Sequence, residues 1–215
     1  MIIAEIGQNF EGDLKLAQKL IKLAYESGAD LAKFQLFDSE VLYGEKIDTE
    51  LTYEQANNLF GYGQYVGIEV FFSVFDVQRV EWCERIGVKY HKIAARVSDP
   101  EIFEAIEKTA KPIFASVDKN YPRILPNGCK KLYCISEYPA PVKFGDAQFG
   151  ENKYYDGYSD HTYGLDACKI ALAKGATIIE KHFSVSHDVG VDGAWSMTPE
   201  ELRELKRFAL VVEEI

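Results

Sequence analysis

The chain has 215 residues, of which 47% are hydrophobic and 13% aromatic, and these values exclude a disordered or fibrous chain. A formal net charge of −10 argues against a nucleic-acid partner, although a local cluster of lysines could still bind an anionic small molecule. The length suits one α/β barrel, because such barrels commonly have about 200–250 residues.

Neither a secretion signal nor a membrane segment is expected from the sequence. Residues 2–6 are apolar, with no basic region before them and no long apolar run that ends in a cleavage site. No apolar run approaches the length that spans a bilayer. Because no Cys-x-x-Cys pair occurs, we expect a cytoplasmic protein with reduced, mostly buried thiols at Cys83, Cys129, Cys134 and Cys168.

The first half of the chain alternates short apolar runs with helical patterns. Strands are expected at residues 2–6, 30–37, 68–75 and 88–95. Helices are expected at residues 13–27, 52–66, 76–86 and 99–108. Thr52 is an expected N-cap, and Pro100 lies near a first helical position. The connection at residues 38–51 is long and holds several charges.

The second half continues the alternation with two weaker helices. Strands are expected at residues 111–117, 131–136, 154–159 and 176–183. Prolines weaken the helical pattern at residues 118–128 and 139–145, so these connections are expected to be abbreviated. One helix is expected at residues 163–175, and the last begins with a capping-box pattern at Thr198 and runs to the C-terminus.

Strands that alternate with helices indicate a parallel sheet with right-handed crossovers. Eight such units favour closure, so the expected fold class is α/β, as a compact (β/α)8 TIM barrel forming a single domain over residues 1–215. An open doubly wound sheet is the alternative. No Gly-x-Gly-x-x-Gly follows the first strand, so the usual dinucleotide-binding pattern is absent.

Polar side chains are expected to meet at the carboxyl ends of the strands, where active sites of such barrels lie. With His182 pointing inward, strand alternation places a set of polar residues from six strands at this end. The set is Glu5, Lys33, Gln35, Lys92, Ser136, Ser159, His161, Glu180 and His182. Two histidines with a carboxylate suit a divalent ion, and two lysines with hydroxyls suit a phosphate or a carboxylate.

Six segments resemble the N-acetylneuraminate (sialic acid) synthases, in that family's order and near its spacing. They lie at residues 3–9, 28–35, 90–93, 136–141, 157–162 and 180–183. The resemblance implies a barrel that condenses phosphoenolpyruvate with an N-acetylmannosamine-like amino-sugar aldehyde. The product would be a nonulosonic, sialic-acid-like 2-keto acid, with phosphate released by C–O cleavage.

The resemblance also implies roles for individual residues. Glu5 would be the catalytic carboxylate, and His161 and His182 would hold a divalent metal, with manganese expected and magnesium or cobalt as alternatives. The residues that would bind the two substrates are Lys33, Lys92 and Ser159 for phosphoenolpyruvate, and Gln35, Tyr138 and Asp192 for the sugar. Ser136 stands where the family has an asparagine, and both a substrate contact and a structural role are open for it.

The chain departs from the family pattern in its phosphate site and in its length. Val74 and Ala95 each stand where the family carries a phosphate-binding hydroxyl. We also expect the chain to lack the family's C-terminal antifreeze-like domain. We therefore expect a divergent, barrel-only member with an altered acceptor, for which a homo-oligomer or a separate lid-domain protein are candidate partners.

Other interpretations of these residues stay open. The barrel could be a non-catalytic or regulatory protein that binds a sugar acid, or a Schiff-base aldolase that uses Lys33 or Lys92. Glu180 is better explained as a structural ion-pair partner, and Asp160 as a helix cap or a support for the site. Tyr138 could equally shape its loop.

Overall fold

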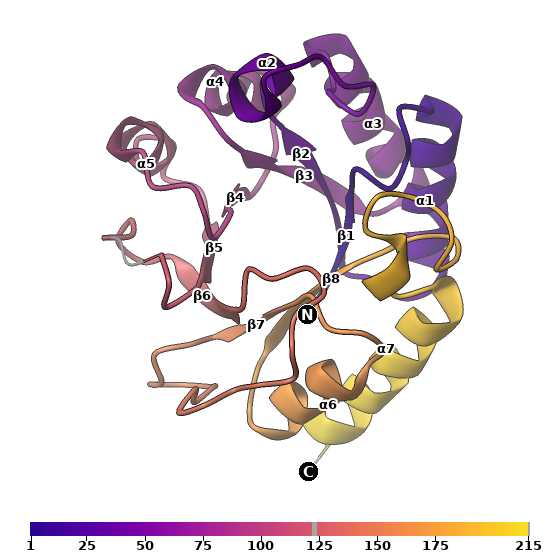
Figure 1. Cartoon of the computed structure of the whole chain (residues 1–215), viewed down its shortest axis with the longest axis vertical. Coiled ribbons are helices and arrows are strands. Elements are labelled where there is room, and N and C mark those ends of the chain that lie inside the picture. The colour runs from indigo at the N-terminus through magenta and orange to yellow at the C-terminus, as the bar shows by residue number, and fades with distance from the viewer. Residues whose placement is uncertain (122–123, 215) are drawn as a thin grey trace.

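The computed structural model of the chain describes residues 1–121 and 124–214. Eight parallel strands follow one another in chain order around a closed barrel, in which β1 pairs with both β2 and β8 (Figure 1). The predicted (β/α)8 architecture is confirmed, and the open doubly wound sheet is wrong.

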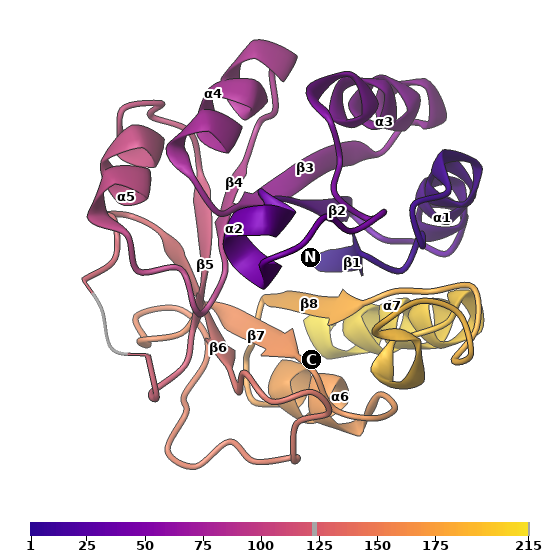
Figure 2. The ribbon, with the colours of Figure 1, turned by 45° about the horizontal axis from the view of Figure 1, so that its top comes forward.

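The elements lie close to the predicted ranges. The strands are β1 (Ile2–Gly7), β2 (Leu31–Leu36), β3 (Glu69–Val74), β4 (His91–Ile93), β5 (Ile113–Val117), β6 (Lys130–Cys134), β7 (Gly157–Asp160) and β8 (Ile178–His182). The helices are α1 (Leu14–Glu26), α2 (Ser39–Tyr43), α3 (Tyr53–Val66), α4 (Val77–Ile86), α5 (Pro100–Glu107), α6 (Asp166–Ala173) and α7 (Pro199–Glu213), with a 3-10 turn η1 (Gly193–Trp195). Figure 2 shows α1, α3, α4, α5, α6 and α7 around the outside of the ring of strands, whereas the short α2 is drawn over the ring.

The two predicted weak connections have no α-helix among their described residues. They join β5 to β6 and β6 to β7, and Figure 1 shows the second as a long irregular segment. Residues 122 and 123 of the first connection lie outside the described ranges, as does residue 215 beyond the last helix. The barrel is therefore covered by helices on only part of its circumference.

Side-chain caps explain where most helices begin. Thr52 and Thr198 each form a complete capping box, as the sequence predicted. The short helix α2 was not predicted and lies in the long charged connection. Asp38 caps it by accepting a hydrogen bond from the backbone N–H of Val41 at 3.2 Å.

The barrel interior has an aromatic layer below a polar one. The rings of Phe71, Tyr90 and Phe114 lie with their centroids 5.5–6.0 Å apart inside the barrel. Two residues farther along the same strands, the inward side chains become polar at Ser73 and Lys92. This change from apolar to polar places the site at the carboxyl end.

The described part of the chain contains no helix that is long and apolar enough to cross a membrane. All four cysteines are buried, and none of them forms a disulfide, as predicted.

Candidate active site at the carboxyl end of the barrel

Two lysines face two carboxylates in the polar layer. Lys33 Nζ forms an ion pair with Glu5 Oε2 and lies 3.8 Å from Glu180 Oε1. Lys92 Nζ lies 3.3 Å from the same oxygen of Glu180. The strand register explains this meeting, because Glu5 is the neighbour of Lys33 in β2 and of His182 in β8. Most of the inward-facing residues expected from strand alternation are thus brought together, and all of the set are buried except Gln35, which is half-buried.

Two serines that the sequence analysis did not select hold the lysines. Lys33 Nζ donates a hydrogen bond to Ser73 Oγ at 2.8 Å, and Lys92 Nζ donates one to Ser116 Oγ at 2.8 Å. Strand alternation in β3 and β5 would have found both serines, because each lies two residues after an inward phenylalanine.

The two buried carboxylates have pKa values displaced in opposite directions. Burial raises the pKa of Glu5, and the nearby charge of Glu180 adds to this rise, although Lys33 opposes it. Burial also works against ionised Glu180, but the charges of Lys33 and Lys92 outweigh it and lower its pKa. Such a divergence is typical of an acid/base site, and it favours Glu5 as the group that carries a proton.

The two histidines lie side by side under an aromatic ring. The ring centroids of His161 and His182 are 5.5 Å apart, and the ring of Tyr138 lies 4.3 Å from that of His161. His161 Nδ1 is 2.8 Å from the carbonyl oxygen of Ile135. Nearby, the Cys134 thiol stays protonated because burial raises its pKa to about 12.

The histidine pKa values also diverge. Burial, together with the neighbouring His182, lowers the pKa of His161 to about 4. Burial disfavours charged His182 as well, but Asp192 outweighs this effect and raises the pKa of His182. His182 Nδ1 is 3.2 Å from Asp192 Oδ2, yet this buried nitrogen makes no well-aligned hydrogen bond to a described residue.

The two imidazoles fit a divalent ion as a pair of nitrogen ligands. Both can reach one ion at their separation, because a metal–nitrogen bond is about 2.1 Å long. The carbonyl beside His161 and the carboxylate beside His182 are the partners that commonly orient histidine ligands. No group of three or more His, Cys, Asp or Glu side chains among the described residues could hold an ion, so water or substrate would complete the coordination.

A buried ion pair supports the segment that carries His161. Behind the barrel wall, Lys181 Nζ donates hydrogen bonds to Asp160 Oδ2 at 2.8 Å and to the carbonyl of Thr162 at 2.7 Å. Asp160 also accepts hydrogen bonds from the Thr162 N–H and the Cys168 thiol. Lys181 therefore binds both neighbours of His161, which agrees with the supporting role considered for Asp160.

Asn9 fixes the loop that carries Asp192. Its side-chain amide donates to the carbonyl of Phe183 at 3.1 Å and to Ser196 Oγ at 2.9 Å, and its Oδ1 accepts from the Asp192 N–H at 2.9 Å. Gly190 approaches so closely that an added Cβ would lie 2.4 Å from Asn9 Oδ1. No local sequence pattern assigns a role to Asn9, because its partners lie more than 170 residues away.

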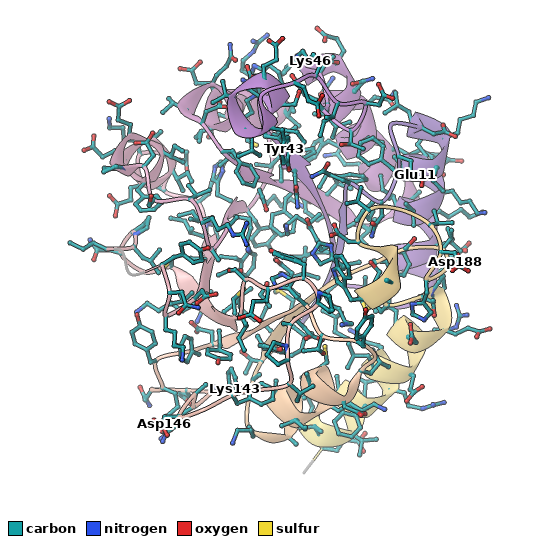
Figure 3. All side chains as sticks on the ribbon, in the orientation of Figure 1. Glu11, Tyr43, Lys46, Lys143, Asp146 and Asp188 are labelled. Atoms are coloured by element: carbon teal, nitrogen blue, oxygen red, sulfur yellow. The ribbon has the colours of Figure 1, made fainter. Side chains whose placement is uncertain are left out.

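The site consists of an inner and an outer cavity. The inner cavity, of about 50 Å³, is lined by the ion pairs, the serines and the histidines. The outer cavity, of about 420 Å³, is lined by Gln8, Gln35, Leu42, Tyr43, Phe75, Ala94, Ala95, Arg96, Val97, Tyr138, His182, Val191 and Asp192. Tyr43 of α2 lies toward the centre of Figure 3, whereas Lys46 lies at its outer edge.

The remaining predicted residues have different positions in the site. Gln35 donates a hydrogen bond to Glu5 Oε1 at 3.0 Å, and Ser159 donates one to Glu180 Oε1 at 3.2 Å. Ser136 is not one of the described residues that line either cavity. Its N–H donates to Asp118 Oδ2 at 2.6 Å, which favours a structural role.

Comparisons with known proteins agree on one group. The family model of the NeuB family matches residues 45–215. The N-acetylneuraminate-9-phosphate synthase of Mus musculus is 32% identical over 99% of this chain and 70% of its own length. The N,N'-diacetyllegionaminic acid synthase of Campylobacter jejuni is 30% identical over 95% of this chain and 74% of its own. The crystal structure of an N-acetylneuraminic acid synthetase from Leptospira borgpetersenii has a TM-score of 0.85, with 27% identity, and the match covers 99% of this chain and 83% of that one.

Proposed function

This chain belongs to the NeuB family, and we propose that it condenses phosphoenolpyruvate with an amino-sugar aldehyde to form a nonulosonic 2-keto acid. Members of the family are phosphoenolpyruvate-using synthases of such acids. The observation that carries the proposal is the convergence of Glu5, two lysines and two histidines on one buried cavity.

The proposed reaction forms one carbon–carbon bond and breaks one carbon–oxygen bond. The methylene carbon of phosphoenolpyruvate attacks the aldehyde carbon, and the aldehyde oxygen takes a proton. Water then adds to the second carbon of the former phosphoenolpyruvate. The bond from this carbon to the bridging oxygen breaks, so phosphate leaves with that oxygen and the keto oxygen comes from water.

Glu5 is the proposed acid/base group. Its raised pKa favours the protonated form relative to an ordinary glutamate, which suits a group that exchanges a proton with the aldehyde oxygen or with the attacking water. The hydrogen bond from Gln35 holds one carboxyl oxygen in place, and Lys33 contacts the other. Lys33 and Lys92 would then stabilise negative charge as it develops on the substrates.

His161 and His182 are the proposed metal ligands. The low pKa of His161 keeps its imidazole neutral, as metal binding requires. A divalent ion bound there, for which we propose manganese, would polarise the aldehyde as a Lewis acid. Tyr138, Gln35 and Asp192 line the outer cavity, where the rest of an N-acetylmannosamine-like sugar would lie.

The test is phosphate release that depends on the acceptor. Manganese-loaded protein is incubated with phosphoenolpyruvate and a panel of amino sugars, and inorganic phosphate is measured. Glu5→Gln should reduce the rate by roughly 100-fold or more. Glu104→Gln removes an exposed carboxylate on α5 and should leave the rate within twofold. Absence of release with every acceptor, or full activity of Glu5→Gln, would refute the proposal.

One observation favours a second candidate, a Schiff-base aldolase. Burial lowers the pKa of Lys92, which makes its amine more available as a nucleophile. Borohydride treatment in the presence of a carbonyl substrate should then label Lys92. If peptide mass analysis finds no label there, this candidate is removed.

A further inference from the structure

Arg96 is an exposed arginine at the wall of the outer cavity, two residues before Ser98 and just after Ala94 and Ala95. Its Nη2 donates a hydrogen bond to the carbonyl of Ser136 at 2.9 Å. Its guanidinium lies 5.8 Å from the ring centroid of Tyr121 and 5.8 Å from that of Tyr138. These contacts hold the planar group while most of its N–H donors stay available.

The charges around the two cavities leave Arg96 as the uncompensated cation. Lys33 and Lys92 face Glu5 and Glu180, so each lysine of the inner cavity already has a carboxyl group beside it. No ion pair joins Arg96 to a carboxylate in the described part of the chain. It is also the only lysine or arginine among the described residues that line the outer cavity.

We propose that Arg96 binds the phosphate group of a substrate in the outer cavity. A guanidinium offers parallel N–H donors that match two phosphate oxygens. Ala94 and Ala95 beside it have no side-chain donors, so Arg96 supplies the charged recognition on this side. The identity of the substrate rests on the proposed function.

The phosphate could belong to either substrate of the proposed reaction. One source is the phosphate of phosphoenolpyruvate, and the other is a phosphate on the far end of the amino sugar. The outer cavity, of about 420 Å³, lies within the usual size range of small-molecule sites. The chemistry of recognition is the same for both sources, so binding of matched compounds must separate them.

The experiment is calorimetric binding, which needs no turnover. Phosphoenolpyruvate is compared with pyruvate, and N-acetylmannosamine 6-phosphate with N-acetylmannosamine, for the wild type, Arg96→Gln and Arg96→Lys. Arg96→Gln should weaken binding of one phosphorylated compound roughly 10- to 100-fold, because a charged hydrogen-bonding pair is lost. The affinity of Arg96→Lys for this compound should lie between those of the wild type and Arg96→Gln. The affinities for the unphosphorylated compounds should change less than twofold.

Arg85→Gln is the matched control. Arg85 is an exposed arginine stacked on the ring of Tyr53 at 4.4 Å on the outside of the barrel, and its loss should leave every affinity within twofold. A loss confined to phosphoenolpyruvate, or to the phosphorylated sugar, identifies the source. Equal affinities of wild type and Arg96→Gln, or no binding of any phosphorylated compound by the wild type, would overturn the proposal. If Arg96→Gln does not fold, Arg96→Lys decides the test. These affinities are measured without turnover, so a failure of the proposed reaction alone would leave them unchanged.

Discussion

At the residue scale, the buried pair of Lys181 and Asp160 determines where His161 lies. Replacing Lys181 by Met leaves a buried carboxylate without its cation, which typically costs about 3–5 kcal/mol. We predict that Lys181→Met lowers the free energy of unfolding at pH 7 by about this amount in urea titrations. Binding of manganese should weaken as well, because both neighbours of His161 lose a hydrogen-bond partner.

A second ion pair provides the control for this prediction. Lys130 Nζ lies 2.8 Å from Asp156 Oδ1, the same separation as in the buried pair, but the Lys130 side chain is 57% exposed. Lys130→Met should therefore cost only about 0–1 kcal/mol. Equal losses in the two variants would contradict the assigned role of Lys181.

Much of the inward-facing set could be predicted from the sequence, because a strand alternates its side chains with a period of two. Once His182 was taken to point inward, Glu180 in the same strand followed from this rule. Glu180 was expected to be an ion-pair partner, but which lysines it meets could not be predicted, because this depends on which strands become neighbours at the closed seam. Asn9 and Arg96 lie after strand ends, where no periodic pattern fixes the direction of a side chain.

At the element scale, the loop between β8 and α7 depends on a close approach at Gly190. This residue has φ of +88°, and a Cβ there would collide with Asn9. Gly190→Ala should lower the free energy of unfolding by about 2–5 kcal/mol, from backbone strain together with overpacking. Hydrogen exchange at residues 184–197 should become faster.

Gly87 is a suitable control for backbone strain alone. It has φ of +91°, and an added Cβ would meet nothing within 4 Å. Gly87→Ala should cost only about 1–2 kcal/mol and leave exchange in the distant loop unchanged. If both glycine variants lose the same stability, the contact with Asn9 is not what holds the loop.

Glu50 holds together the segment that carries α2, because its carboxylate accepts hydrogen bonds from Ser39 and Lys46. Burial opposes its charge, but hydrogen bonds from Lys46 and Ser39 outweigh this and lower the pKa of Glu50 to about 2. Between pH 4.5 and 2 the unfolded chain therefore binds more protons at this residue than the folded protein does. The contribution of ionised Glu50 to the free energy of unfolding is complete above pH 4.5 and is lost as the pH falls toward 2.

Glu50→Gln should accordingly destabilise the protein in a pH-dependent way. We predict a loss of about 2 kcal/mol at pH 7, smaller than the full pKa displacement implies because the carboxylate is partly solvated. The difference between wild type and variant should shrink as urea titrations move from pH 4.5 toward pH 2. A constant difference across this range would contradict the prediction, and the exposed Glu104→Gln should change stability by less than about 0.5 kcal/mol throughout.

Helix positions were predictable where a cap and an apolar period coincide, as at Thr52 and Thr198. The helix α2 was missed because it has only five residues, too few to show a period. Its place at the outer cavity depends on long-range contacts, such as the hydrogen bond from Gln8 to the Tyr43 hydroxyl at 3.0 Å.

At the scale of the whole molecule, closure of the barrel joins residues from both ends of the chain into one site. Eight alternating units were enough to predict this closure, and β1 pairs with β8 as a closed barrel requires. Closure brings Glu5 beside His182, so the proposed acid/base group and the proposed metal ligands share one cavity. The net charge of −10 makes the local cation Arg96 the more important for an anionic substrate.

The central claim, condensation with C–O cleavage, is tested most directly with phosphoenolpyruvate that carries oxygen-18 at its bridging position. With an accepted amino sugar, the released phosphate should retain the label, and the keto oxygen of the product should come from water. Release of labelled phosphate and formation of the product should both depend on the acceptor, and both should be lost in Glu5→Gln. Phosphate without the label, or release that is independent of any acceptor, would contradict the account.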